Sequence, residues 1–452
     1  MPAALDQVFK AYDVRGVYPD QLDEELAERV GRAFVALTGA GTLAIGQDMR
    51  PSSKPMADAL AAGAMAQGAD VLRVGLCSTD MLYYVSGALD VAGVMLTASH
   101  NPARYNGLKL CRPGAVPVGE ESGLADIKRM VAAGEPATPS ASRGQERQAD
   151  DLLERYAAHV RSFVDLGSLR PLKVVADAGN GMAGHVVPAV FAGLPFELVA
   201  MYFELDGNFP NHPADPLNPE NLRELQARVV AEGADVGLAF DGDADRVFLV
   251  DELGATVPSS LVGALVARLM CEREPGATVL HNLICSRVVP ETIREAGGVP
   301  VRTRVGHSFI KAVMAETGAI FGCEHSGHYY FRDNYRADSG LIAALVALDA
   351  LSRAGRPLSE VLAPYRRYAA SGEINRRVDG DPRKVIEEVA GRYPADAADF
   401  ADGLTVEGGD WWFNLRPSNT EPLLRLNVEA ATEAEMARVR DEVLEAVGGE
   451  PA

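Results

Sequence analysis

Short apolar runs recur along the chain, and most of them stop abruptly at a polar or glycine-containing loop. Continuous apolar runs predict buried strands, whereas alanine-rich stretches with helical periodicity predict helices. On this basis we expect strands over 43–46, 70–74 and 91–96, and a helix over 52–67. Strands that alternate with helices predict a parallel α/β arrangement.

The order helix, glycine, strand, loop occurs three times. The phrase Gly-Ala-Asp-Val stands at 68–71 and 233–236, each time before a strand, and a third version spans 294–305. We therefore expect three similar α/β domains, each giving one loop to a shared cleft at the carboxyl ends of its strands. Further strands are expected over 173–178 and 236–240, and helices over 221–232 and 339–354.

The last part of the chain has a different pattern. From about residue 368 it predicts an alternating strand over 372–378, a helix over 382–393, tryptophan-containing strands and a helix over 433–447. Residues 133–148 are rich in proline, serine, glycine and charge, so they are expected to form an exposed connection. The 452 residues leave room for roughly three or four domains.

Composition excludes several classes of partner. The net charge is −20, from 43 basic against 63 acidic residues, which argues against nucleic acid or an anionic membrane. Five widely spaced cysteines without a C-x-x-C pair indicate neither a disulfide framework nor a zinc site, and they suit a reducing compartment. No signal-peptide core and no segment of membrane-spanning length is visible, so a cytoplasmic soluble protein is expected.

The first candidate for chemistry follows the strand over 91–96, in Thr97-Ala98-Ser99-His100-Asn101-Pro102. Asn-Pro blocks a helix, so Ser99 is expected on a loop. A hydroxyl there, with His100 beside it and Lys109 ten residues on, has the parts of an activated nucleophile. A hydrogen-bonded turn without catalysis is the alternative.

A second candidate follows the strand over 236–240. Asp241, Asp243 and Asp245 alternate with Gly242 and Ala244, and an arginine follows them. Carboxylates this close raise each other's pKa values unless a cation sits among them, and oxygen ligands favour Mg²⁺. An acidic turn is the alternative, while the spacing does not fit a calcium-binding EF-hand loop.

Two further loops carry donors and acceptors for a polar ligand. Glu324, Ser326 and His328 alternate in Gly-Cys-Glu-His-Ser-Gly-His and project together if that loop is extended, as in sugar recognition; His325 and His328 could instead be a metal pair, without a suitable third ligand. Residues 415–422 gather donors typical of a phosphate cup, with a polar hairpin as the alternative. These donors are Arg416, Ser418, Asn419 and Thr420.

Two other segments of the sequence each allow more than one interpretation. Tyr12 and Arg15, near a short strand that ends in Gly16, could serve a ligand or form a surface ion pair. The glycines of 179–184 resemble a phosphate-cradling loop but lack the Walker lysine and the dinucleotide spacing, so tight strand-to-helix packing is expected there.

The four motifs T-A-S-H-N-P, D-G-D-A-D-R, G-C-E-H-S-G-H and R-P-S-N-T-E-P, in this order, resemble the α-D-phosphohexomutases, most nearly bacterial phosphomannomutase/phosphoglucomutase. The resemblance covers the whole chain and implies an α/β fold with four domains around a central cleft. Three of them would be similar α/β domains with mixed sheets, and the last an α+β domain. The expected boundaries are 1–150, 151–252, 253–367 and 368–452.

The resemblance also implies roles for individual residues. Ser99 would be carried as phosphoserine, and its phosphate would join Asp241, Asp243 and Asp245 around Mg²⁺. Catalysis would use Ser99 with His100 and Lys109 in proton transfer, and Arg246 beside them. The expected substrate-binding residues are Tyr12, Arg15, His307, Glu324, Ser326, His328, Arg416, Ser418, Asn419 and Thr420.

The implied activity is reversible transfer of phosphate between C6 and C1 of a hexose phosphate, through phosphoserine and a hexose 1,6-bisphosphate. Phosphomannomutase, with phosphoglucomutase activity as well, is expected; phosphoglucosamine mutase and a non-catalytic sugar-phosphate-binding protein are the alternatives. His325 and Ile284 depart from the methionine and lysine that relatives often have, whereas Asp338-Ser339-Gly340 favours mannose. We expect a monomer or weak homodimer.

Overall fold

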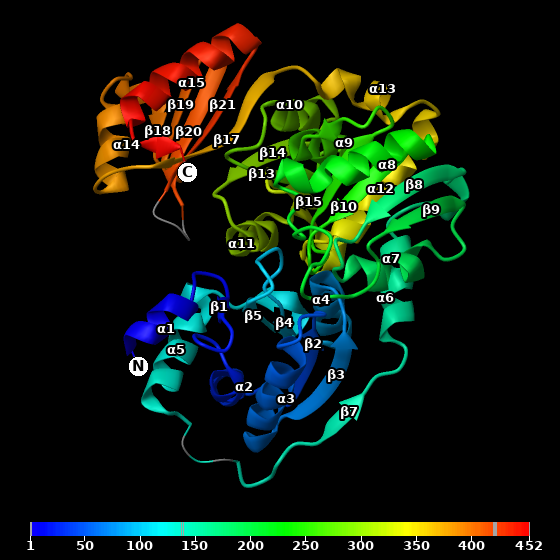
Figure 1. Ribbon diagram of the computed structural model, residues 1–452, viewed down its shortest axis with the longest axis vertical. Helices are drawn as coiled ribbons and strands as arrows, with labels where there is room; N and C mark the ends of the chain where they lie inside the picture. Colours follow the sequence, from blue (N-terminus) through cyan, green and yellow to red (C-terminus); the bar gives the residue numbers. More distant parts are fainter. Residues whose placement is uncertain (1, 137, 139, 419–422, 452) are drawn as a thin grey trace.

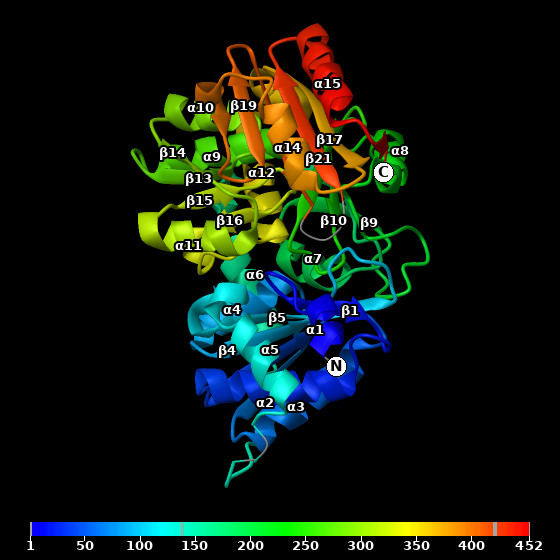
Figure 2. The ribbon, with the colours of Figure 1, turned by 90° about the vertical axis from the view of Figure 1, so that its left-hand side faces the viewer.

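The computed structural model describes residues 2–136, 138, 140–418 and 423–451 and is built on four sheets. We call the parts built on these sheets domains 1 to 4. In Figure 1, domain 1 lies at the bottom in blue and cyan, domain 4 at the top in orange and red, and domains 2 and 3 are mainly green and yellow. Figure 2 shows the same stacking from the side.

Domain 1 has a mixed sheet in the order β1-β5-β4-β2-β3-β7, with β6 on β5. Strands β2, β3, β4 and β7 run parallel, and β5 runs antiparallel to both β4 and β1. Its elements are α1 (Pro2–Val8), β1 (Val14–Val17), α2 (Glu24–Thr38), β2 (Thr42–Gln47), α3 (Ser53–Ala66), β3 (Asp70–Leu76), α4 (Thr79–Leu89), β4 (Ala92–Leu96), β5 (Tyr105–Arg112), β6 (Val116–Pro117), α5 (Leu124–Ala133) and β7 (Glu146–Gln148).

Domain 2 has a five-stranded sheet in the order β12-β11-β10-β8-β9, in which β8, β9 and β10 are parallel. A short turn precedes β8. The loop with Asp241, Asp243 and Asp245, the candidate metal site, lies between β10 and β11. The elements are α6 (Leu152–Arg161), β8 (Leu172–Asp177), α7 (Ala183–Phe191), β9 (Phe196–Met201), α8 (Arg223–Glu232), β10 (Val236–Phe240), β11 (Val247–Asp251) and β12 (Thr256–Val257).

Domain 3 has the strand order β14-β13-β15-β16, and only the pair β15-β16 is antiparallel. Buried helices α9 and α12 pack against each other behind it. The elements are α9 (Ser259–Arg273), β13 (Thr278–Asn282), α10 (Val288–Glu295), β14 (Val299–Thr303), α11 (His307–Thr317), β15 (Phe321–Cys323), β16 (Tyr329–Phe331), α12 (Gly340–Ala354) and α13 (Leu358–Leu362).

Domain 4 is an antiparallel sheet in the order β18-β19-β20-β21-β17-β22, against which α14 and α15 pack. The predicted fold class, α/β domains followed by an α+β domain, is confirmed. The elements are β17 (Ala369–Arg377), α14 (Pro382–Ala390), β18 (Ala398–Asp399), β19 (Leu404–Gly408), β20 (Trp411–Pro417), β21 (Leu424–Ala430), α15 (Glu433–Val447) and β22 (Glu450–Pro451).

Some element ends differ from the sequence prediction. The helix expected from residue 221 begins at Arg223, because Pro219–Leu222 forms a 3-10 turn first. The helix expected to end at 393 ends at Ala390. The connection over 133–148 contains β7, an exposed edge strand that pairs with β3.

The apolar core explains how the domains are joined. One continuous cluster of buried side chains runs from domain 1, through domain 2, to α9 and α12 of domain 3. Domain 4 has an apolar cluster of its own. Among the described residues, no helix combines the length and the apolar character needed to cross a membrane.

A fully buried carboxylate, Asp80, ties the first three domains together. Its Oδ2 accepts hydrogen bonds from Tyr156 of α6 at 2.6 Å and from Ser339, the N-cap of α12, at 2.5 Å. Ser78, the N-cap of α4, donates to the other oxygen. Burial raises the pKa of Asp80 to about 6, although these hydroxyls favour the ionised form.

We expect Asp80→Asn to lower the free energy of unfolding by about 1–3 kcal/mol, because an amide group cannot accept all three buried hydroxyl donors. The folded-state pKa lies above the ordinary value of 3.8, so the folded chain binds a proton where the unfolded chain does not. Wild-type stability should therefore rise relative to the variant as pH falls through about 6 toward 4. Urea unfolding at several pH values, with the exposed Asp58→Asn as control, measures this; a gap that does not change with pH contradicts it.

Candidate active site

Ser99 lies in the loop that follows β4, and its backbone adopts φ 51°, a left-handed conformation that is uncommon for a non-glycine residue. The backbone N–H of Ser99 donates to Thr97 Oγ1 at 2.9 Å. The buried guanidinium of Arg50 donates to the carbonyl oxygens of Ser99 and Asn101 at 2.8 and 2.7 Å, and to those of Pro102 and Tyr105. The strained loop is therefore held rigidly, as expected for a positioned nucleophile.

The acidic loop between β10 and β11 packs directly against the Ser99 loop. A Cβ added to Gly242 would lie 2.4 Å from the carbonyl oxygen of Ser99, which explains the small residue between the carboxylates. This contact places Ser99 Oγ 2.8 Å from Asp241 Oδ2, and the hydroxyl donates a hydrogen bond to that carboxylate. The predicted nucleophile and the predicted metal loop therefore meet across the boundary between domains 1 and 2.

Lys109, on β5, reaches into the acidic loop. Its Nζ lies 2.7 Å from both Asp243 Oδ2 and Asp245 Oδ2. Burial disfavours the charged amine, but the two carboxylates outweigh it and raise the pKa of Lys109 above its usual range. Burial likewise opposes ionisation of Asp243, yet the Lys109 ammonium and a 2.6 Å hydrogen bond from Thr79 lower its pKa. Lys109 is therefore a cation that pairs with both carboxylates.

The acidic loop retains the ligand capacity that a metal ion needs. Asp241, Asp243 and Asp245 each offer an oxygen, all within 4.8 Å of one another. All three are buried, and Oδ1 of both Asp243 and Asp245 has no hydrogen-bond partner among the described residues. Buried oxygens of this kind are costly unless a cation binds them, so the donor set fits a hard divalent ion.

The pKa of Asp241 is raised, whereas that of Asp243 is lowered. Burial, together with the charges of Asp245 and Asp243, raises the pKa of Asp241 to about 7, although Arg246 opposes this. Arg246 Nε donates to Asp241 Oδ2 at 2.9 Å. Asp241 is thus the nearest acceptor for the hydroxyl proton of Ser99.

The hydrogen bonds of His100 identify its tautomer. Arg246 donates to His100 Nδ1 at 2.6 Å, and a guanidinium has no acceptor, so Nδ1 carries the lone pair. Burial and the nearby Arg246 charge lower the pKa of His100 well below its ordinary value, so the ring is neutral. Ser99 Oγ lies 3.3 Å from the same nitrogen. His100 is therefore placed as an acceptor.

The loop with Glu324, Ser326 and His328 is a tight hairpin turn between β15 and β16, so the extended form considered above is wrong. Gly327 has φ 85°, and the backbone N–H of Glu324 donates to the carbonyl oxygen of His328 at 3.0 Å. The pairing still brings Glu324 and His328 side by side, while Ser326 lies at the half-exposed turn. The Glu324 carboxylate accepts bonds from Tyr330 Oη at 2.7 Å, Gly306 N at 3.0 Å and Asn282 Nδ2 at 3.3 Å.

His328 is oriented by a buried ion pair. Its Nδ1 lies 2.8 Å from Asp338 Oδ2, and Lys311 Nζ lies 3.0 Å from Asp338 Oδ1. Burial opposes protonation of His328, but Asp338 outweighs it and raises the pKa of the ring. Since His328, Asp245 and Asp338 also form a group with metal-ligand spacing, this histidine belongs beside the acidic loop. Among the described residues, His325 joins no such group.

Three further candidates for substrate binding are Arg15 and Tyr12 of domain 1 and His307 of domain 3. Arg15 donates to Asn101 Oδ1 at 2.6 Å and forms an ion pair with Asp13. The Tyr12 ring makes an edge contact with Phe309 at 6.1 Å between centroids. His307 is the first residue of α11, and only its backbone is described.

Arg416 brings domain 4 to the site. It is 5% exposed and donates to Glu373 Oε2 at 3.1 Å, while its Nε has no hydrogen-bond partner among the described residues. Charges of Asp402, Arg304, Glu324 and Arg416 all act on the Tyr12 phenol, whose pKa is raised first by burial. Parts of domains 1, 3 and 4 therefore converge there.

The other residues of the predicted phosphate cup follow Arg416 in the chain. The Ser418 backbone N–H donates to the carbonyl oxygen of Leu423 at 2.8 Å, and Asn419 and Thr420 lie outside the described residues.

The structure shows the surroundings of Ile284 and His325, which differ from the residues that relatives often have, and of the 179–184 glycine loop. Ile284 is buried with Leu283 and Trp412 between domains 3 and 4. His325 is half-buried, and burial lowers its pKa. A Cβ on Gly181 would lie 2.7 Å from the carbonyl oxygen of Gly242, so the 179–184 loop packs tightly against the acidic loop.

Comparison with known protein families finds a match for each of the four domains. Profiles described as phosphoglucomutase/phosphomannomutase, alpha/beta/alpha domains I, II and III match residues 6–137, 154–254 and 258–368, and the C-terminal domain of that family matches 373–446. The chain belongs to the phosphoglucomutase/phosphomannomutase family. The family resemblance inferred from the four motifs is thereby confirmed.

Its relatives cover the whole chain. Phosphohexose mutases of Xanthomonas campestris pv. campestris are 42% identical over 437 residues, 96% of this chain and 97% of that protein. A phosphomannomutase of Escherichia coli K12 is 39% identical over 446 residues, 96% and 97% of the two chains. The crystal structure of a family protein from Burkholderia thailandensis has a TM-score of 0.88 and 33% identity, and covers 98% of this chain and 99% of its own.

Several residues that contact the candidate site were not predicted from the sequence of this family member. Thr79 contacts Asp243 from another domain, and a threonine after a strand gave no signal of that contact. Lys311 and Arg50 are basic residues that a sequence pattern places at the surface, yet they are 3% and 2% exposed. Asn282 of β13 and Tyr330 of β16 hold Glu324 through bonds that depend on the pairing of β15 with both strands.

Proposed function

We propose that this chain is a phosphomannomutase that also accepts glucose phosphates and moves phosphate between C6 and C1 of the hexose. The observation that carries the proposal is the 2.8 Å hydrogen bond from Ser99 to Asp241, which joins a buried hydroxyl on a strained loop to a buried acidic cluster in which two oxygens have no hydrogen-bond partner among the described residues. Relatives named phosphomannomutase at 39% identity over 96% of the chain support the same reaction. The role of each residue below is part of the proposal.

Magnesium is the proposed ion, held by Asp241, Asp243, Asp245 and the phosphate on Ser99; when bound it would neutralise charge on the transferring phosphoryl group. In the first half-reaction the bond between phosphorus and Ser99 Oγ breaks, and a bond to the free C1 or C6 hydroxyl forms. Neutral His100 accepts the proton of the attacking hydroxyl. Protonated Lys109 returns a proton to Ser99 Oγ.

The second half-reaction reverses these transfers. The hexose 1,6-bisphosphate turns over, Ser99 attacks its other phosphate, and both protons return to where they began. Glu324, Ser326 and His328 hold the sugar hydroxyls, and Tyr12, Arg15 and His307 are the other residues proposed to bind the substrate. Arg416, Ser418, Asn419 and Thr420 bind the phosphate that does not react, in either orientation of the sugar.

Arg416→Ala should lower kcat/KM by roughly 30- to 150-fold, because a charge-assisted contact of on the order of 2–3 kcal/mol is lost. The same cup serves both orientations, so the forward and reverse reactions should suffer together. Steady-state kinetics in both directions measure this, with the exposed Arg438→Ala of α15 as control. An unchanged kcat/KM makes the loop a structural hairpin.

A substrate panel tests the proposal as a whole. Mannose 1-phosphate, glucose 1-phosphate and glucosamine 1-phosphate are assayed with hexose 1,6-bisphosphate and Mg²⁺, and mannose is expected to give the highest kcat/KM. A clear preference for glucosamine assigns the alternative mutase, and no turnover with any of them rejects the enzyme. We expect the chain to act in the cytoplasm as a monomer or weak homodimer, and its charge of −20 argues against nucleic acid or an anionic membrane as a partner.

A further inference from the structure

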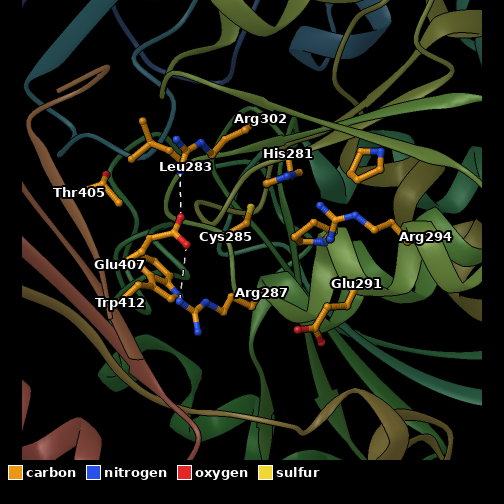
Figure 3. Close-up of a pocket in the computed structure, with 12 residues that line it drawn as sticks. His281, Leu283, Cys285, Arg287, Glu291, Arg294, Arg302, Thr405, Glu407 and Trp412 are labelled. Atoms are coloured by element: carbon orange, nitrogen blue, oxygen red, sulfur yellow. Dashed lines mark hydrogen bonds and ion pairs between the residues drawn. The ribbon is translucent and has the colours of Figure 1, made fainter. Parts of the chain in front are cut away.

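A cavity of about 380 Å³ lies between domains 3 and 4, away from the residues proposed for catalysis. One side is formed by α10, β13 and β14 of domain 3, and the other by β19 and β20 of domain 4. Its volume is within the range of small-molecule sites, which begins at about 300 Å³. Figure 3 shows its charged side chains gathered around a common space.

Three arginines line this cavity: Arg287, Arg294 and Arg302. Arg287 and Arg302 flank Glu407 of domain 4, with N···O distances of 3.6 and 3.4 Å (Figure 3). Arg287 also donates to the backbone oxygens of Gly409 and Trp411, so its guanidinium is fixed. Two of the three cations are therefore already oriented, and one carboxylate is shared between them.

The third cation has no such partner. The side chain of Arg294, an exposed residue, makes no hydrogen bond or ion pair with the residues that the structure describes, and its guanidinium is directed into the cavity in Figure 3. The other lining carboxylate, Glu291, is bound by Arg367 at 3.1 Å and by the Tyr368 hydroxyl. The lining carries three arginines against two carboxylates, and Asp399 of domain 4 also pairs with Arg302, so Arg294 is the lining cation without a carboxylate partner among the described residues.

The uncharged part of the lining suits an organic group. His281 is 7% exposed, and its Nδ1 lies 3.1 Å from the carbonyl oxygen of Asn282; a carbonyl only accepts, so Nδ1 donates and Nε2 carries the lone pair. Burial, together with the charges of Arg302 and Arg294, lowers the pKa of His281 to about 4, although the hydrogen bond to Asn282 opposes this. Trp412 and two proline rings provide apolar walls.

We propose that this cavity binds a small phosphate monoester, with the phosphate on Arg294 and the organic group between His281 and Trp412. The guanidinium fork of Arg294 matches the oxygens of a phosphate. The lone pair of His281 Nε2 accepts from a ligand hydroxyl. The proposal does not depend on mutase activity and would hold for a chain without turnover.

Such a ligand would affect the active site through two routes. It would contact both domains, and domain 4 carries Arg416. The cavity also reaches Cys285, whose thiol donates to Asn282 Oδ1 at 3.1 Å, while Asn282 Nδ2 donates to Glu324. Occupancy should therefore change KM for the hexose phosphate.

Tryptophan fluorescence can test the site directly, because Trp411 and Trp412 are the two tryptophans of the chain. In Trp411→Phe, the emission reports on Trp412 alone. This full-length protein is titrated at constant ionic strength with inorganic phosphate, a hexose 6-phosphate and a nucleoside 5′-monophosphate. We expect a saturable change with at least one of them, and the order of affinities tells whether phosphate, sugar or base is recognised.

Three variants in the same background separate this cavity from other sites. Arg294→Gln should weaken the affinity roughly tenfold or more, because a charge-assisted contact is lost. Arg155→Gln, an exposed helical arginine, should leave it unchanged, and so should Arg416→Ala in the proposed active site. No saturable change, equal affinity in Arg294→Gln, or loss in Arg416→Ala would overturn the proposal, whereas mutase assays on the same proteins report independently on the proposed function.

Discussion

Ser99→Ala should lose mutase turnover by roughly a thousandfold or more while the fold and the acidic cluster stay in place. The reason is chemical: alanine cannot carry a phosphoryl group, and no other hydroxyl replaces a covalent carrier. The structural cost is small, since the substitution removes one oxygen that bonds to Asp241 and leaves the loop bonds made by Arg50 untouched. Coupled assays for turnover and titration calorimetry with hexose phosphate measure the two effects.

Intact mass spectrometry gives a second readout for the same variant. Wild-type protein incubated with hexose 1,6-bisphosphate should gain the mass of one phosphoryl group, and Ser99→Ala should not. Ser162→Ala, at the exposed end of α6, should behave like the wild type. Turnover close to wild type in Ser99→Ala, or phosphorylation of that variant at the same level, would remove Ser99 as the carrier.

Asp243→Asn should weaken Mg²⁺ binding and lower kcat by about a hundredfold or more, because metal charge stabilisation is worth several kcal/mol in such transfers. Asp243 has one oxygen held by Lys109 and Thr79, and its other oxygen has no hydrogen-bond partner in the described part of the chain. The amide is neutral and can present only one acceptor oxygen. It therefore removes charge from the metal site without removing core volume.

The dependence of turnover on Mg²⁺ concentration distinguishes this effect from unfolding. The midpoint should move to higher Mg²⁺ in Asp243→Asn, while the far-ultraviolet circular dichroism spectrum stays that of the wild type. Asp441→Asn, an exposed carboxylate on α15, provides the control. An unchanged Mg²⁺ midpoint would take Asp243 out of the metal site.

The amino-acid sequence by itself determined the fold class and the family, and it predicted which loops carry the candidate chemistry. Apolar runs predicted β10 at its observed bounds and β4 within one residue, and the loop chemistry after each run is visible in the sequence. These features are local, since a strand and the turn that follows it depend on neighbouring residues. The shapes of individual loops were harder to predict: the hairpin at Gly327 follows from pairing of β15 with β16.

Only the tertiary structure decided how charges are distributed among the loops. Lys109 lies between Asp243 and Asp245, more than a hundred residues away in the chain, and it holds one oxygen of each while the other remains available to a metal. Arg50 and Lys311 became buried supports because carbonyl oxygens and Asp338 converge on them. Such pairings depend on which elements the fold brings together, and local hydrophobic periodicity contains no information about contacts at that separation.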